Sequence, residues 1–286
     1  MSQEFIQFKK QRELGEILSV TFKFLRENYK PAGRIFLKLV GPVFILLIAS
    51  VTYYAWATLD FSFMSASGFD SSGFVISAAL MLLAYLLYIT TMTGTVYHII
   101  KSYMTNQGEI ISTEVVNGMK SDFGKLLLLT FISWILIFAG MLLFILPGIY
   151  LAIPLSLASA VLVFRREGVM DSISDCFQLV KNNWWMTFAT LLCIGLIVYL
   201  IGLIFQLPVL FFYMIKAFII ASEGSAADVS EVFGPGYIIL NVITSIFQYL
   251  IYSITPIGVA FVYFNLNEKQ NFTGAYETIQ KLGNNN

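Results

Sequence analysis

Long runs without Asp, Glu, Lys or Arg constrain this chain more than any other feature of its sequence. A helix needs about 20 mostly apolar residues to cross the hydrocarbon core of a bilayer, because the core is about 30 Å thick and each residue adds about 1.5 Å. The runs that reach this length are 39–59, 71–100, 126–164, 182–215 and 232–267. We therefore expect an all-α membrane protein.

The third run is too long for a single crossing. Its centre reads Leu146-Pro147-Gly148, in which a helix-breaking proline is followed by a turn residue. A break there divides the run into spans at about 126–146 and 149–164. The sequence thus predicts a polytopic helical bundle with about six transmembrane helices.

The composition agrees with residence in a bilayer. Hydrophobic residues make up 58% of the 286 residues and charged residues only 12%, whereas soluble domains are about 45–50% apolar. The formal net charge is zero, so no basic field points to nucleic acid. We expect the lipid bilayer to be the main partner, with other membrane or cytoplasmic proteins as further candidates. The two cysteines, Cys176 and Cys193, are too few for a disulfide framework, and we interpret them as small packing residues.

The charges between the spans predict the orientation, because cytoplasmic loops collect Lys and Arg near the ends of spans. Segments 60–73 and 222–236 carry acidic residues and no Lys or Arg. The opposite side carries Lys9, Lys10, Arg12, Lys23, Arg26, Lys30, Arg34, Lys38, Lys101, Lys120, Lys125, Arg165, Arg166, Lys181, Lys269 and Lys281. Both termini are therefore predicted to be cytoplasmic.

A pattern repeats before the first and fifth spans. Leu14, Leu18, Thr21, Phe22 and Leu25 align with Val169, Ile173, Cys176, Phe177 and Val180, and in both sets the spacing places them on one helix face. A weaker copy precedes the third span. We interpret each unit as an amphipathic helix in the cytoplasmic interface followed by a transmembrane hairpin. Chance similarity among apolar helices is the alternative.

This interpretation divides a single membrane domain, 1–286, into three hairpin units and a tail. The units span about 12–104, 110–164 and 168–264, and an amphipathic C-terminal tail spans 265–286. Each helix ends in a basic and aromatic cluster, which is typical of a membrane-interface anchor. The predicted anchors are Arg26, Tyr29, Lys120, Phe123, Lys181, Trp184 and Trp185.

The sequence predicts no catalytic, metal-binding or cofactor-binding residues. The usual nucleotide-binding and nucleophile motifs do not occur, and His98 is the only histidine. Glu167, Asp171 and Asp175 are interpreted as a solvated helix face. The hydroxyl-rich stretch of the second span, with Thr90, Thr91 and Thr95, either lines a polar path or permits close helix packing.

Residues 146–185 carry a family resemblance. Leu146-Pro147-Gly148-Ile149-Tyr150-Leu151 and a helix ending with Lys181, Asn183 and Trp184 resemble the membrane domain attached to some glycerophosphodiester phosphodiesterases and its stand-alone bacterial relatives. Those enzymes cleave their substrate with a separate soluble barrel, so the resemblance does not imply catalysis here. It implies a protein of the bacterial cytoplasmic membrane that assists envelope or lipid processes.

Three functional hypotheses follow. The first is a non-enzymatic scaffold or accessory protein, favoured by repeated interfacial anchoring without catalytic motifs. The second is a transporter or channel for a small or lipidic molecule, favoured by the hairpin repeat and the threonine-rich face. The third is a membrane enzyme acting on lipids, which requires a polar cluster that the sequence does not display.

Overall fold

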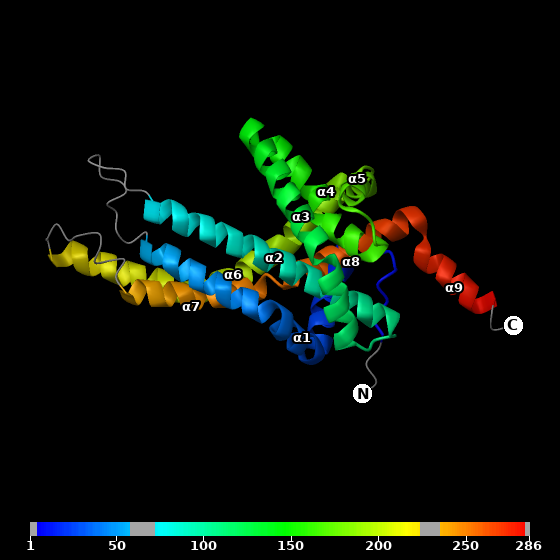
Figure 1. The fold of residues 1–286 in the computed structure, drawn as a ribbon, viewed down its shortest axis with the longest axis horizontal. Helices are drawn as coiled ribbons and strands as arrows, with labels where there is room; N and C mark the ends of the chain where they lie inside the picture. The colour runs from blue at the N-terminus through cyan, green and yellow to red at the C-terminus, as the bar shows by residue number, and fades with distance from the viewer. Residues whose placement is uncertain (1–4, 58–71, 224–234, 284–286) are drawn as a thin grey trace. The chain divides into compact units, whose positions relative to one another are not determined.

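The computed structural model describes residues 5–57, 72–223 and 235–283, and their regular secondary structure is entirely α-helical (Figure 1). The all-α prediction is confirmed. The helices are α1 (Leu14–Ala57), α2 (Ser72–Thr105), α3 (Ser112–Leu143), α4 (Ile145–Arg165), α5 (Val169–Val180), α6 (Trp184–Glu223), α7 (Pro235–Ile251), α8 (Ile254–Asn271) and α9 (Thr273–Gly283).

Within the described residues, six segments are long and apolar enough to cross a membrane, which confirms the predicted set of spans. They are Leu14–Ala57, Gly73–Thr105, Ser112–Leu143, Ile145–Arg165, Trp184–Ile219 and Gly236–Asn271. The sixth differs from the expected single helix, because α7 ends at Ile251 and α8 begins at Ile254.

The amphipathic segments differ in how they join their spans. Before the first and third spans the segment and the span form one continuous helix, α1 of 44 residues and α3 of 32 residues. Before the fifth span, α5 is a separate helix of 12 residues. The adjacent residues Asn182 and Asn183 explain the difference, because asparagine side chains compete for backbone hydrogen bonds and favour turns. No Asn pair occurs in the other two segments.

The break in the third apolar run is confirmed, although it lies slightly earlier than predicted. Phe144 alone separates α3 from α4 and has extended backbone angles, φ −162° and ψ 153°. Pro147 is the third residue of α4, where its missing N–H would have no acceptor within the helix. Gly140 and Gly148 face each other here, since a Cβ on Gly140 would lie 3.0 Å from the Gly148 Cα.

The described residues form two compact units, each with its own packing. The first comprises residues within 1–40, 89–196 and 253–286, and the second comprises residues within 41–88 and 197–252. An aromatic cluster fills the first unit, where Phe8 stacks on Phe261 at 4.5 Å and contacts Phe24 and Phe264. In the second unit the Tyr88 hydroxyl donates to the carbonyl of Tyr249 at 2.6 Å.

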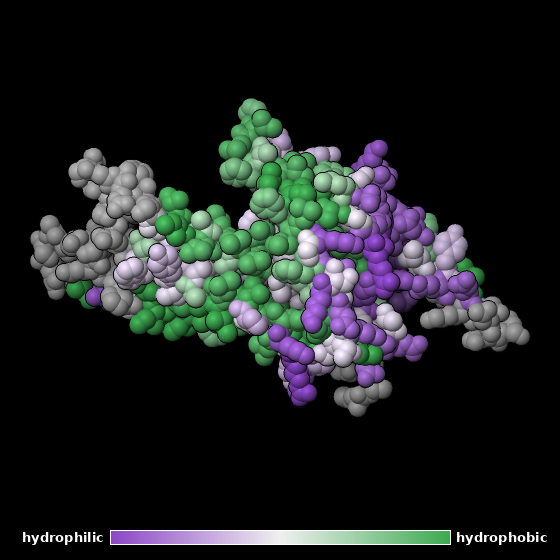
Figure 2. Space-filling view, in the orientation of Figure 1, coloured by the Kyte–Doolittle hydropathy of each residue, from purple (hydrophilic) through white to green (hydrophobic). Residues whose placement is uncertain are grey.

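Surface polarity in the first unit divides along its helices. The end of the α3–α4 hairpin is hydrophobic, whereas hydrophilic residues gather over the region of α5, α8 and α9 (Figure 2). At the hairpin end Phe138, Leu142, Phe144 and Leu146 are 66–77% exposed. Exposed apolar side chains at such density are expected where lipid, rather than water, surrounds the helices.

Candidate functional site: an aromatic pocket built from two motif segments

The two segments of the 146–185 motif meet around one cavity. Its volume is about 970 Å³, and all of its lining residues belong to the first unit. We call this cavity the aromatic pocket. Its lining residues are Leu146, Pro147, Tyr150, Leu151, Lys181, Asn182, Asn183, Trp184, Trp185 and Met186.

Trp184 joins the two segments. Its ring stacks on Tyr150 of α4 with centroids 5.7 Å apart, and on Phe188, one turn further along α6, at 5.5 Å. The Trp184 indole Nε1 donates a hydrogen bond to the Tyr150 carbonyl at 3.4 Å. The Trp185 ring meets Trp184 edge-on at 4.9 Å and is 76% exposed. Trp184 thus forms part of the pocket wall, whereas Trp185 is accessible to a ligand or to lipid.

Helix α5 brings the second segment to the first. Tyr150 and Arg165 are 15 residues apart in α4, about 22 Å at 1.5 Å per residue, and the 12 residues of α5 span about 18 Å. Because Trp184 contacts Tyr150 after this return, α5 runs back alongside α4. The short loop at Arg166–Gly168 reverses the chain.

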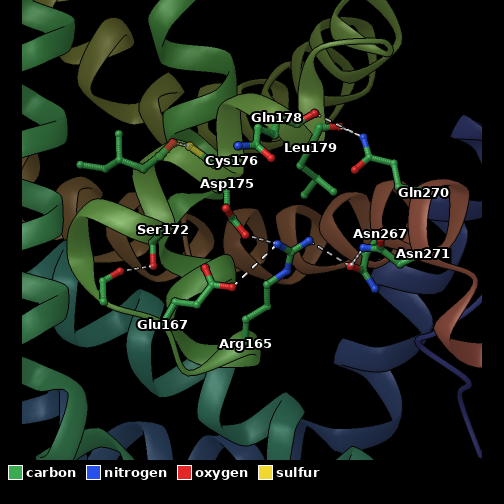
Figure 3. A network of polar contacts seen from close by, with 12 residues as sticks. Arg165, Glu167, Ser172, Asp175, Cys176, Gln178, Leu179, Asn267, Gln270 and Asn271 are labelled. Carbon is green, nitrogen blue, oxygen red and sulfur yellow. Dashed lines mark hydrogen bonds and ion pairs between the residues drawn. The ribbon is translucent and has the colours of Figure 1, made fainter.

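Arg165 fixes α5 in this position (Figure 3). Its guanidinium forms ion pairs with Asp175 of α5 and with Glu167 in the loop, the latter at 3.8 Å. It also donates to the Asn267 side chain of α8 at 3.2 Å. Gln270 of α8 then donates to the carbonyl of Leu179 at 2.9 Å. The Gln270 contact satisfies a carbonyl of the last turn of α5, where the carbonyls lack N–H donors within the helix, just before the pocket segment begins.

The predicted solvated acidic face is therefore only partly correct. Asp171 is exposed, whereas Asp175 and Glu167 bind Arg165. Burial raises the pKa of Glu167 above its ordinary value, and Asp175 nearby adds to this effect while Arg165 opposes it. The positive charge of Arg165 offsets the electrostatic repulsion between Asp175 and Glu167.

Of the seven predicted anchors, the structure brings three together. Lys181, Trp184 and Trp185 line the aromatic pocket. Arg26 and Tyr29 are exposed on α1, where the Lys30 ammonium lies 5.8 Å from the Tyr29 ring, and on α3 Lys120 is exposed and Phe123 half-buried. Their placement at a membrane interface stays a prediction.

The predicted polar face of α2 is buried. Thr90, Thr91 and Thr95 are at most 5% exposed, and the hydroxyl oxygens of Thr90 and Thr95 have no hydrogen-bond partner among the described residues. These threonines do not line the aromatic pocket. A polar path and close helix packing are the two interpretations of these threonines.

The chemistry of the aromatic pocket suits binding. Its lining combines apolar and aromatic side chains with one ammonium, from Lys181, and two amides, from Asn182 and Asn183. Within 5–57, 72–223 and 235–283 no group of three or more His, Cys, Asp or Glu side chains is placed to hold a metal. Tyr150 belongs to the Leu146–Leu151 motif, but the motif alone does not mark it as a site residue, because its contact with Trp184 depends on the return of α5.

Comparisons with known proteins agree with this picture of a membrane protein. A sequence profile of an uncharacterised protein family, UPF0259, matches residues 70–223, which include the motif. A UPF0259 membrane protein of Serratia proteamaculans (strain 568) is 35% identical over 81 residues, a stretch that covers 28% of this chain and 32% of the relative. No solved structure matches. The chain is a multi-pass membrane protein and belongs to the UPF0259 family.

Proposed function

We propose that this protein is a non-enzymatic scaffold or accessory subunit of the bacterial cytoplasmic membrane, with both termini in the cytoplasm. The observation that carries the proposal is the aromatic pocket. Its lining combines the exposed indole of Trp185 and the ammonium of Lys181 with apolar side chains. Tryptophan and tyrosine are enriched at protein–protein interfaces and at bilayer interfaces, and Lys and Arg gather at the cytoplasmic ends of spans.

We further propose that it shares a role in envelope or lipid processes with the membrane domain of glycerophosphodiester phosphodiesterases. The support is that residues of both segments that carry the resemblance, Leu146–Leu151 and Lys181–Trp184, line one cavity. Segments that are 30 residues or more apart and that build a single pocket suggest one shared binding role.

Copurification tests the scaffold role. The full chain, extracted from its native membrane in mild detergent, is expected to carry a partner protein in fixed proportion. The double variant Lys181→Gln/Trp185→Ala is expected to lose that partner, because it removes the charge and the exposed ring. Trp56→Ala is the matched control, since Trp56 is 66% exposed and does not line the pocket.

Two outcomes contradict the scaffold proposal. One is a partner retained equally by the double variant and the control. The other is release of a product from membrane lipids by the purified protein alone, which requires an enzyme.

Transport is the second candidate, supported by the buried unpaired hydroxyls of Thr90 and Thr95. Buried polar atoms without partners are uncommon and need an explanation, and a polar path is one. Purified protein in liposomes is then expected to release an enclosed small solute, and Thr90→Val/Thr95→Val is expected to reduce the flux. Absence of flux for a panel of small solutes and labelled lipids contradicts transport.

A further inference from the structure

A second cavity lies in the first unit, at helix ends. It has a volume of about 670 Å³ and is bounded by the last turns of α2, the first turns of α3 and the junction of α4 with α5. We call it the helix-end cavity. Its lining residues are His98, Lys101, Ser102, Thr105, Glu114, Asn117, Gly118, Ser121, Asp122, Lys125, Leu162, Arg166 and Glu167.

Each carboxylate in this cavity has a polar neighbour, and the Glu167 Oε2 atom is buried without a hydrogen bond among the described residues. Glu114 accepts hydrogen bonds from Ser102 and Asn106, both at 2.8 Å. Asp122 lies 3.3 Å from the His98 Nε2 atom, and Glu167 lies 3.8 Å from Arg165. None of these contacts involves Lys101, Lys125 or Arg166.

The three cationic side chains of this cavity have no carboxylate partner among the described residues. The Lys101 ammonium donates to a neutral acceptor, the carbonyl of Val163, at 2.6 Å. Within the described part of the chain the side chains of Lys125 and Arg166 make no hydrogen bond or ion pair. The lining therefore holds three carboxylates and three cations, and none of the three cations forms an ion pair with a carboxylate among the described residues.

The backbone at Arg166 adds a second, independent observation. Its angles, φ 61° and ψ 38°, lie in the left-handed region where α4 ends. Glycine or asparagine adopts this conformation at helix ends with little strain, whereas other residues rarely do. An arginine held there carries a conformational cost, and such costs concentrate at functional sites.

We propose that the helix-end cavity binds a phosphate-type anion through Lys101, Lys125 and Arg166. Arginine and lysine recognise phosphate oxygens through charge-assisted hydrogen bonds. The source is the headgroup of an anionic phospholipid or a soluble phosphate. Three candidate spans begin or end at this cavity, which is the depth at which lipid headgroups lie. The proposal goes beyond the scaffold role and does not depend on it.

The test uses the full chain in detergent, with inorganic phosphate, phosphatidylglycerol and phosphatidylcholine as probes. Native mass spectrometry measures retained lipid, and calorimetry measures phosphate binding. Arg166→Gly/Lys125→Gln is expected to weaken binding at least tenfold without lowering the unfolding temperature, because glycine relieves the left-handed backbone. Lys10→Gln is the matched control, since Lys10 is exposed and does not line the cavity.

The probes separate the sources. Binding of phosphatidylglycerol over phosphatidylcholine, with no binding of inorganic phosphate, supports the headgroup. Binding of inorganic phosphate that competes with the lipid supports a soluble ligand. The proposal is overturned if the folded double variant and Lys10→Gln bind equally well, or if the wild-type chain binds neither phosphatidylglycerol nor inorganic phosphate.

Discussion

Trp184 and Trp185 are neighbours in the chain but have different surroundings. Trp184 is held between Tyr150 and Phe188, whereas Trp185 is 76% exposed. Stacked aromatic pairs contribute about 0.5–1.5 kcal/mol beyond the area they bury. We therefore expect Trp184 to contribute to the stability of the fold and Trp185 to contribute to binding.

Trp184→Ala is expected to destabilise the protein by about 2 kcal/mol, because it removes two ring contacts and leaves a partial cavity. Trp185→Ala is expected to change stability by no more than about 0.5 kcal/mol, as for other exposed side chains. Thermal unfolding of both variants in the same detergent measures the difference. Equal losses of stability would show that the stacking on Tyr150 and Phe188 contributes little.

Cys176 is a second residue whose surroundings decide its chemistry. It is fully buried, its thiol donates to the Ile173 carbonyl at 3.0 Å, and burial raises its pKa to about 12. The thiolate is the reactive form, and at pH 8 it is nearly absent from a thiol of this pKa. This agrees with the sequence-based interpretation of Cys176 as a packing residue.

In the Cys193→Ala variant, Cys176 is expected to resist a small maleimide at pH 8 while the protein is folded and to react fully after denaturation. Mass spectrometry of the labelled chain measures both states. Raising the pH toward 10 is expected to leave most of the Cys176 thiol protonated, because its pKa is about 12, while any residual labelling rate rises about tenfold per pH unit with the thiolate fraction. Rapid labelling of the folded protein would place the thiol at the surface.

At the scale of helices, α2 and α3 approach closely through small residues. A Cβ on Gly118 would lie 2.4 Å from the His98 Nδ1 atom, and a Cβ on Gly94 would lie 2.7 Å from side-chain atoms of Leu126 and Met119. Small residues at helix crossings are the common device of membrane proteins, since apolar lipid supplies no hydrophobic drive for helices to associate. The helix-end cavity depends on this crossing, because His98 and Asp122 form part of its wall.

Gly118→Ala is expected to destabilise the protein by about 1–3 kcal/mol, because the added methyl group forces the His98 ring away from α3. Gly124→Ala is the matched control on the same helix, where a Cβ would meet no atom within 4 Å. It is expected to stabilise α3 by up to about 1 kcal/mol through helix propensity. Thermal unfolding of both variants measures the changes in stability. Equal changes for the two substitutions would contradict the close crossing of α2 and α3.

At the scale of the whole molecule, the described residues contain six segments that are long and apolar enough to span a bilayer. Their orientation rests on the distribution of Lys and Arg, which the packing of helices does not test. The first unit contains most of the charged residues, and the second unit contains few. This distribution is expected if the charged parts of the first unit contact water and the second unit mainly contacts lipid.

Single cysteines test the orientation in a Cys176→Ala/Cys193→Ala background. In intact cells a membrane-impermeant maleimide is expected to label Gly73→Cys, at the start of α2, and not Lys10→Cys. Both are exposed in the structure, so permeabilised cells are expected to show labelling at both positions. Labelling of Lys10→Cys in intact cells would place the N-terminus outside.

The apolar runs by themselves determined the helical class and the set of candidate spans, because length and hydropathy are local properties that lipid contact rewards directly. The Leu146-Pro147-Gly148 break was visible for the same reason. The sequence also contained both segments of the motif, but it left Tyr150 and Trp184 about 34 residues apart with no sign that they touch.

Only the tertiary structure decided which residues meet. The return of α5 along α4, held by Arg165, Asp175 and Asn267, brings the aromatic pocket together, and the crossing of α2 and α3 forms the helix-end cavity. Both depend on long-range packing and on how each carboxylate is paired. Periodicity along the chain reports which face of a helix is apolar, but not which neighbour covers it, and that choice is made when the helices pack.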